Sequence, residues 1–131
     1  TTFNSQKGIY IDDNSNLYVA DSGNNRIQTF ASGQTSGTTV DTGPVTLNNP
    51  TDVVVDKDGY LFIVDSSNHR IIGSDANGFR CIVACSGSAG TSTSDLSSPS
   101  SLSFDSFGNL YVIDINNSRV VKYTFQTTSC P

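Results

Sequence analysis

The stretch at residues 16–27, NLYVADSGNNRI, is the most informative part of the sequence, because the chain repeats it. It returns at residues 60–71 as YLFIVDSSNHRI and at residues 109–120 as NLYVIDINNSRV. The copies align on the leucines Leu17, Leu61 and Leu110, which lie 44 and then 49 positions apart. Repeats of this period are typical of propeller blades rather than helical solenoids.

Each copy sits inside a unit of short β-type runs separated by Gly, Asn, Asp and Ser. Strands are predicted in the first unit at residues 8–12, 17–21, 26–30 and weakly at 37–40, in the second at 52–56, 60–65, 69–74 and 79–85, and in the third at 102–105, 109–114 and 118–125. Residues 126–131 are too few and too polar for a fourth strand. We therefore predict an all-β chain of about three antiparallel, four-stranded blades that form an incomplete ring.

The expected blades span about residues 8–46, 47–95 and 96–131, and the outer strand of the third is missing or supplied by another segment. Residues 1–3 are the candidate for that strand, either in the same ring or in a neighbouring molecule. A blade cannot bury both of its faces alone, so it stacks on neighbours. Three blades leave two open faces, and we expect another copy to cover them, in a ring or in a filament.

The unit resembles the NHL repeat, in which an apolar strand ends in Asp and a turn, an LYVAD-type strand and NNRI follow. The matching residues are Asp12, Asp21, Arg26, Asp56, Asp65, Arg70, Asp105, Asp114 and Arg119. Residues 47–56 and 96–105 also resemble the Leu-x-x-Pro link into a new blade. The resemblance implies four-stranded blades around a channel, most often six, so this chain corresponds to half of such a ring or to a portion excised from a longer protein.

The repeated Asp and Arg side chains are expected to be structural. In each copy an Asp precedes an Arg by five residues, so the two ends of a hairpin loop can meet as an ion pair. A ligand ring is the alternative, but recurrence in every copy favours the structural role. Residues 12–16, DDNSN, place oxygens as calcium loops do, yet they lack the Gly and the bidentate Glu of an EF-hand. A tight turn explains them better.

No catalytic, metal or cofactor site is predicted. His69 is the only histidine, and it replaces Asn25 and Ser118 of the other copies, which indicates a variable loop residue. Propellers resembling NHL proteins include lyases with histidine-ligated metal, and one His without a Cys or carboxylate cluster cannot build such a site. The chain also lacks a GxSxG elbow and a phosphate-binding loop. We therefore expect a protein that is not an enzyme.

The three cysteines are Cys81, Cys85 and Cys130. Residues 81–85, CIVAC, read as strand, and four strand residues span roughly 13 Å, too far for a direct disulfide. The expected bridge joins Cys130 to one of the other two, or joins two molecules. Free buried thiols remain the alternative.

Composition favours an extracellular location. Ser and Thr make up 34 of 131 positions, and the net charge of −5 offers no positive field for nucleic acid or an anionic membrane. No apolar run is long enough to insert into a membrane, and neither an initiator Met nor a signal peptide is present. Asn116 heads the one N-glycosylation sequon, and residues 32–39 and 86–95 suit O-linked sugars.

The leading hypothesis is a secreted, non-catalytic structural or interaction module, a glycoprotein that assembles with its own copies. The alternative is a ligand-binding or sensor domain, for which Phe79, Arg80 and Phe107 are the only non-repeating hints. A metal-dependent lyase or lactonase is the least favoured reading. Fold analogy alone decides none of the three.

Overall fold

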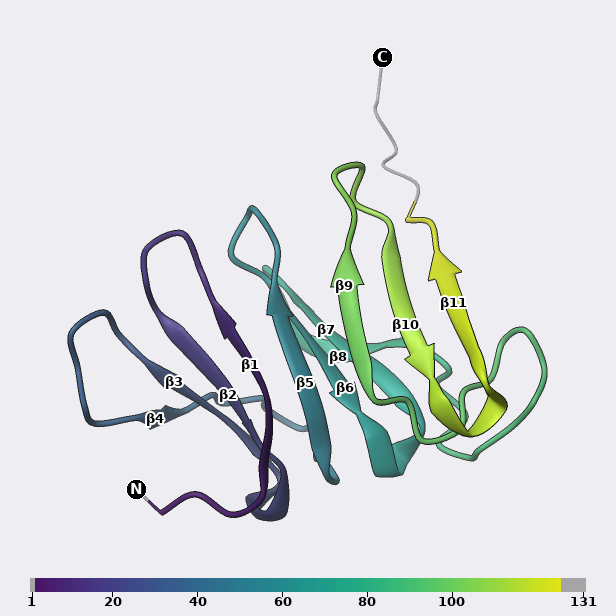
Figure 1. Cartoon of the computed structure of the whole chain (residues 1–131), viewed down its shortest axis with the longest axis horizontal. Helices are drawn as coiled ribbons and strands as arrows, with labels where there is room; N and C mark the ends of the chain where they lie inside the picture. Colours follow the sequence, from purple (N-terminus) through teal and green to yellow (C-terminus); the bar gives the residue numbers. More distant parts are fainter. Residues whose placement is uncertain (1, 126–131) are drawn as a thin grey trace.

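The computed structural model describes residues 2–125 as three antiparallel sheets stacked side by side, with the second in the middle (Figure 1). Blade 1 contains β1 (Gln6–Ile11), β2 (Leu17–Asp21), β3 (Arg26–Phe30) and β4 (Thr38–Thr39). Blade 2 contains β5 (Pro50–Val55), β6 (Leu61–Asp65), β7 (Arg70–Asp75) and β8 (Gly78–Val83). Blade 3 contains β9 (Ser101–Phe104), β10 (Leu110–Asp114) and β11 (Arg119–Tyr123). The predicted all-β fold of repeated antiparallel sheets is confirmed.

The strands of each blade follow chain order, since each strand pairs with the one that precedes it in the sequence. Between the second and third strands lies a single 3₁₀ turn: η1 (Ser22–Asn24), η2 (Ser66–Asn68) or η3 (Ile115–Asn117). The residue after each turn is left-handed: Asn25, His69 and Ser118 have φ of 53°, 54° and 52°. This reversal sends the chain directly into the third strand, where the register places each Asp opposite its Arg.

The apolar core lies in the two joints between blades. The joint between blades 1 and 2 buries Ala20 and Ile27 against Val53, Ile63 and Ile72. The joint between blades 2 and 3 is made by Val54, Val64, Ile71, Val83, Leu96, Leu102, Leu110 and Val112. Because successive strand residues face opposite sides, the middle blade serves both joints at once.

The N-terminal segment belongs to blade 1 and not to blade 3. The carbonyl of Thr2 accepts hydrogen bonds from Asn24 Nδ2 (3.0 Å) and Arg26 Nη2 (3.3 Å). The ring of Phe3 lies 5.8 Å from that of Phe30. Thr2 and Phe3 therefore do not complete the third blade of their own chain, and the alternative that they complete the blade of a neighbouring molecule stays a prediction. Thr1 lies outside the described residues.

Two further observations concern the third blade and the helices. Within residues 2–125, blade 3 has three strands, and residues 126–131 lie outside the described part. No helix in that same part of the chain is long and apolar enough to cross a membrane.

Candidate functional site

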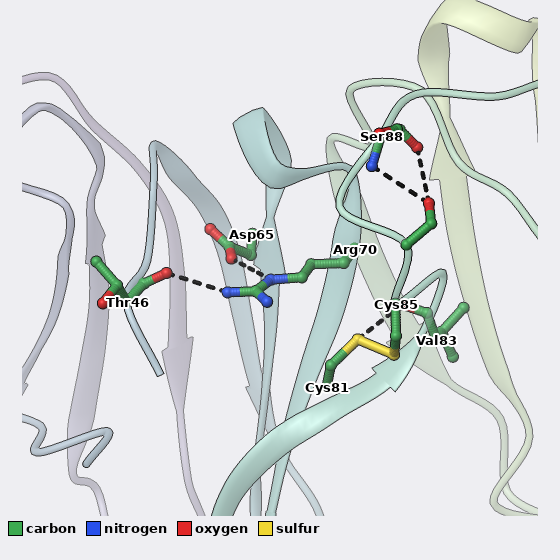
Figure 2. Close-up of a disulfide and its surroundings, with 8 residues drawn as sticks. Thr46, Asp65, Arg70, Cys81, Val83, Cys85 and Ser88 are labelled. Atoms are coloured by element: carbon green, nitrogen blue, oxygen red, sulfur yellow. Dashed lines mark hydrogen bonds and ion pairs between the residues drawn. A yellow bond between two sulfur atoms is a disulfide. The ribbon is translucent and has the colours of Figure 1, made fainter. Parts of the chain in front are cut away.

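Each blade contains a buried Asp–Arg pair at the end of its second strand. In blade 2, the fully buried Asp65 accepts hydrogen bonds from Arg70 Nε (2.8 Å), the backbone N–H of Asn48 (2.7 Å) and Asn68 Nδ2 (2.9 Å). Arg70 Nη2 then donates to the carbonyl of Thr46 at 3.1 Å (Figure 2). The same pairs recur at Asp21–Arg26 (2.8 Å) and Asp114–Arg119 (2.7 Å). The pair thus holds the segment that leads into the blade, residues 46–50 in blade 2 and here called the linking segment, on the blade itself.

At Asp21 and Asp114 these contacts favour the ionised carboxylate. Burial raises the pKa of Asp21, but hydrogen bonds from Asn4, Asn24 and Arg26 and the charge of Arg26 outweigh it, and the pKa is lowered from its ordinary value of 3.8. In Asp114 burial likewise opposes its hydrogen bonds and the Arg119 charge, with the same lowered pKa. A carboxylate whose oxygens already accept several hydrogen bonds has little capacity left for a ligand.

The aspartates after the first strands, Asp12, Asp56 and Asp105, cap the first turn of each blade. Asp105 accepts hydrogen bonds from Asn109 Nδ2, from the backbone N–H groups of Asn109 and Phe107 (2.9 Å each) and from the Tyr111 hydroxyl (3.2 Å). The bond from the Asn109 side chain is the largest cause of a lowered pKa at Asp105. Within residues 2–125, no three His, Cys, Asp or Glu residues form a group that could hold a metal ion.

His69 has a role that the sequence did not indicate: it connects blade 2 to blade 3. Its Nδ1 accepts a hydrogen bond from the backbone N–H of Ser98 at 2.9 Å. At the preceding joint, Asn25 Oδ1 accepts from the N–H of Asn49 at 2.8 Å. The signal was present in the alignment, since Asn25 and His69 occupy the same repeat position and both side chains carry an acceptor.

Cys81 and Cys85 form a disulfide with Cα atoms 5.8 Å apart, which corrects the expected pairing with Cys130 (Figure 2). The strand β8 ends at Val83, and Ala84 is left-handed with φ of 56°. The chain therefore folds back before Cys85, and the distance for an extended strand does not apply. Cys130 lies outside the described residues.

Asn116 lies in η3 and is exposed, and its backbone N–H donates to the carbonyl of Ser97 at 3.3 Å. An exposed side chain is what a glycosylated asparagine requires. Glycosylation there stays a prediction.

The two outer faces of the stack carry exposed apolar side chains. On the face of blade 3 that points away from blade 2, here called the trailing face, the paired residues Ile113 and Val120 are 44% and 65% exposed. On the face of blade 1 that points away from blade 2, here called the leading face, Ile9 and Ile11 are each 62% exposed. Exposed apolar side chains that share a sheet face mark interaction surfaces more often than scattered ones do.

The equivalent residues inside the stack are buried. Ile113 and Val120 correspond to Ala20 and Ile27 of blade 1 and to Val64 and Ile71 of blade 2, all with 0% exposure. Ile9 and Ile11 correspond to Val53 and Val55 of blade 2, with 0% and 7% exposure. Where a neighbouring blade is present, these positions are its contact surface.

A hollow of about 1340 Å³ opens at the end of the stack where the first turns of the three blades lie. Arg80 and Phe107, two of the three non-repeating residues noted in the sequence, both line it, whereas Phe79 packs against the core between blades 1 and 2. Phe107 is 88% exposed, and Arg80 pairs with Asp75 at 3.1 Å on the surface. Tyr10, Phe62 and Phe104 also line the hollow.

Comparison with known proteins identifies the repeat and the fold. The family model of the NHL repeat matches residues 7–30 and 47–73. A search of curated proteins finds no match. Among solved structures, the virginiamycin B lyase of Staphylococcus aureus is 11% identical with a TM-score of 0.62, and the match covers 93% of this chain and 42% of the lyase. A streptogramin B lyase is 15% identical with a TM-score of 0.64, covering 94% of this chain and 41% of that one.

These structures correct the expectation that the protein is not an enzyme. Both are lyases, so catalysis occurs on this arrangement of blades. A single histidine and the lack of a nucleophile motif were therefore insufficient grounds for excluding it. At such low identity the likeness shows the fold alone, and the chain spans about two fifths of either lyase.

Proposed function

Because the chain carries NHL repeats folded as propeller blades, we propose that it is an assembly module whose copies associate through the open sheet faces. One observation carries the proposal: Ile113 and Val120 are exposed on the trailing face, and their equivalents in both other blades are completely buried by the next blade. A second copy of this chain, which carries blade faces of the same design, is the partner that we propose for this uncovered surface.

The energetics indicate concentration-dependent association. Complete burial of one Val, Leu or Ile side chain contributes roughly 1.5–3 kcal/mol. Four partly exposed side chains, Ile9, Ile11, Ile113 and Val120, thus contribute several kcal/mol across one joint. Association costs an estimated 4–15 kcal/mol in lost rotational and translational freedom. The apolar gain and this cost nearly cancel, so these four side chains alone support only weak association, and we expect an affinity weaker than micromolar.

The test is sedimentation velocity over a range of protein concentrations. The average mass should rise above 13.9 kDa with concentration in the wild type and stay at that value in Val120→Lys. Lysine places a charge in the apolar joint, which is unfavourable unless a partner pairs with it. The control is Phe107→Ser, which removes an apolar side chain that is even more exposed than Val120 but lies at the turn end, and this variant should assemble normally. A wild type that stays monomeric, or a Val120→Lys that assembles like it, contradicts the proposal.

We place the module outside the cell. The Cys81–Cys85 disulfide supports this, because such bonds persist in oxidising compartments. An exposed sequon at Asn116 is compatible with the same route. Peptide mapping of native material under non-reducing conditions checks both features. A native protein with free thiols at positions 81 and 85 argues for a reducing compartment instead.

A second candidate function is ligand binding at the turn-end hollow. The favouring observation is that Arg80 and the strongly exposed Phe107 gather there beside three buried or half-buried aromatic rings. Aromatic side chains supply most of the apolar lining of small-molecule sites. A thermal-shift screen of small molecules, run in parallel on wild type and Phe107→Ser, tests this. Hits that shift both proteins equally place the ligand elsewhere.

A further inference from the structure

We propose that copies join head to tail, with the leading face of blade 1 of one copy packed on the trailing face of blade 3 of the next. The inference rests on the assembly function proposed above and names the partner of the trailing face. It follows from comparing the two outer faces with the two joints that the structure already contains.

The apolar half of each internal joint is filled by one residue of the linking segment. Leu47 fills the joint between blades 1 and 2, and Leu96 fills the joint between blades 2 and 3, with 5% and 0% exposure. Phe3 occupies the same place in blade 1: Thr2 before it accepts from Arg26, and Asn4 after it donates to Asp21 at 2.8 Å. Thr46 and Asn48 make the corresponding contacts on either side of Leu47.

Phe3 is therefore positioned to fill a third joint of the same design. Its ring packs on Phe30 of the leading face, where Ile9 and Ile11 are exposed. In the internal joints this face always meets the apolar pair of the preceding blade, such as Val64 and Ile71. On the trailing face of another copy, that pair is Ile113 and Val120.

The polar half of the joint is also preformed. At the internal joints, the N–H of Asn49 or Ser98 donates to the side chain of Asn25 or His69. All four residues are left-handed, with φ of 55°, 47°, 53° and 54°. The equivalent residues at the two outer faces are Ser5 and Ser118, and their φ values are 53° and 52°. Head-to-tail contact brings the Ser5 N–H of one copy to the Ser118 hydroxyl of the next.

Ser118 differs from its counterparts in reach. The acceptor atoms of Asn25 and His69 are attached to Cγ, whereas the hydroxyl oxygen of Ser118 is attached to Cβ, one bond nearer to the backbone. The third hydrogen bond is thus the weakest of the series, and a longer acceptor should improve it. Asparagine also tolerates the left-handed conformation well.

A contact between two different faces is heterologous, and it makes a ring when the rotation closes and a filament when it does not. Two trailing faces, or two leading faces, would instead form an isologous dimer. Complementation distinguishes these arrangements. Ile9→Lys blocks the leading face and Val120→Lys blocks the trailing face, and both side chains are mostly exposed, so the fold should survive, as far-UV circular dichroism will show.

In the head-to-tail arrangement each blocked variant alone is monomeric by sedimentation velocity. An equimolar mixture forms a two-chain species that grows no further, because the one remaining pair of compatible faces is used. Ile9→Lys that still dimerises alone indicates contact between trailing faces, and Val120→Lys that dimerises alone indicates contact between leading faces. Either result overturns the inference, as does a mixture that stays monomeric.

Two single substitutions probe the joint itself. Phe3→Ala should weaken self-association at least about 10-fold. Ser118→Asn should tighten it by up to about 5-fold, because it replaces the weakest of these hydrogen bonds by one of full strength. Assembly that is lost in Val120→Lys but unchanged by both substitutions overturns the head-to-tail joint and leaves the assembly function intact. A wild type that is monomeric at every concentration removes both.

Discussion

Replacing Asp65 by alanine tests whether the buried Asp–Arg pairs hold each linking segment on its blade. The substitution removes a fully buried carboxylate that accepts three hydrogen bonds of 2.7–2.9 Å, from Asn48, Asn68 and Arg70. Hydrogen bonds to charged groups contribute about 1.5–3 kcal/mol each, and their losses are not additive. Breaking a buried ion pair by removing one partner costs about 3–5 kcal/mol. We expect the free energy of unfolding to fall by about 4 kcal/mol.

The assay is urea unfolding followed by far-UV circular dichroism. With a slope of about 2 kcal/mol per molar urea, the midpoint should fall by about 2 M. Arg70→Ala should cost less, about 2 kcal/mol, because Asp65 keeps two of its donors and the Arg70 side chain is 23% exposed. Asp13→Ala, at an exposed turn position, is the control and should change stability by less than about 0.5 kcal/mol.

Two results would contradict this account of the pair. The first is an unfolding free energy of Asp65→Ala within about 1 kcal/mol of wild type, which would mean that the linking segment is held by its apolar contacts alone. Alternatively, Arg70→Ala could cost more than Asp65→Ala. The arginine would then be the dominant member, through its bond to the Thr46 carbonyl rather than through the carboxylate.

Three more expectations concern stability. The pKa values of Asp21 and Asp114 are lowered in the folded state, so the stability that these groups contribute is complete above the ordinary value of 3.8 and is lost as the pH falls below it. The melting temperature should therefore drop in that pH range. A smaller drop in Asp21→Asn would show the contribution of Asp21. Replacing Cys81 and Cys85 by alanine should lower the free energy of unfolding, measured in urea, by about 2 kcal/mol, since the disulfide closes a loop of only five residues. A much larger decrease would indicate that the disulfide constrains more than this loop. His69→Ala should lower the free energy of unfolding by about 1 kcal/mol. His69→Asn should be nearly neutral, because asparagine restores the acceptor that is used at the other joint. Equal losses of stability in the two variants would mean that the hydrogen bond is unimportant.

The sequence was sufficient for the strands and the Asp turns because both depend on local patterns. Alternating apolar runs bounded by Asp, Asn and Gly specify hairpins with little help from the rest of the chain. Three aligned copies also provided three independent indications for each strand and turn. The five-residue spacing of Asp21 and Arg26 predicted their contact, since the two residues end directly opposite each other in the β2–β3 register.

The disulfide was missed because its cause has no sequence signal. Ala84 adopts a left-handed conformation that this residue type rarely takes, and neither glycine nor asparagine marks the reversal. Thr2 and Phe3 were assigned to the wrong blade for a related reason. The linking segments of blades 2 and 3 carry a leucine followed three residues later by proline, but in blade 1 Phe3 and Gln6 stand in those places. Only the hydrogen bonds of Thr2 and Asn4 reveal the equivalence.

The three blades allow equivalent residues to be compared in different surroundings. Ile113 and Val120 are as apolar as Val64 and Ile71, so their exposure reflects what surrounds them and not what they are. On a sheet face that stays exposed to solvent, polar residues would fit as well as this pair of apolar residues. The leading face shows the same contrast at Ile9, against the buried Val53. The two outer faces carry equivalent positions at opposite ends of one stack, and the contact that we propose between copies would join them in the arrangement that the two internal joints already use.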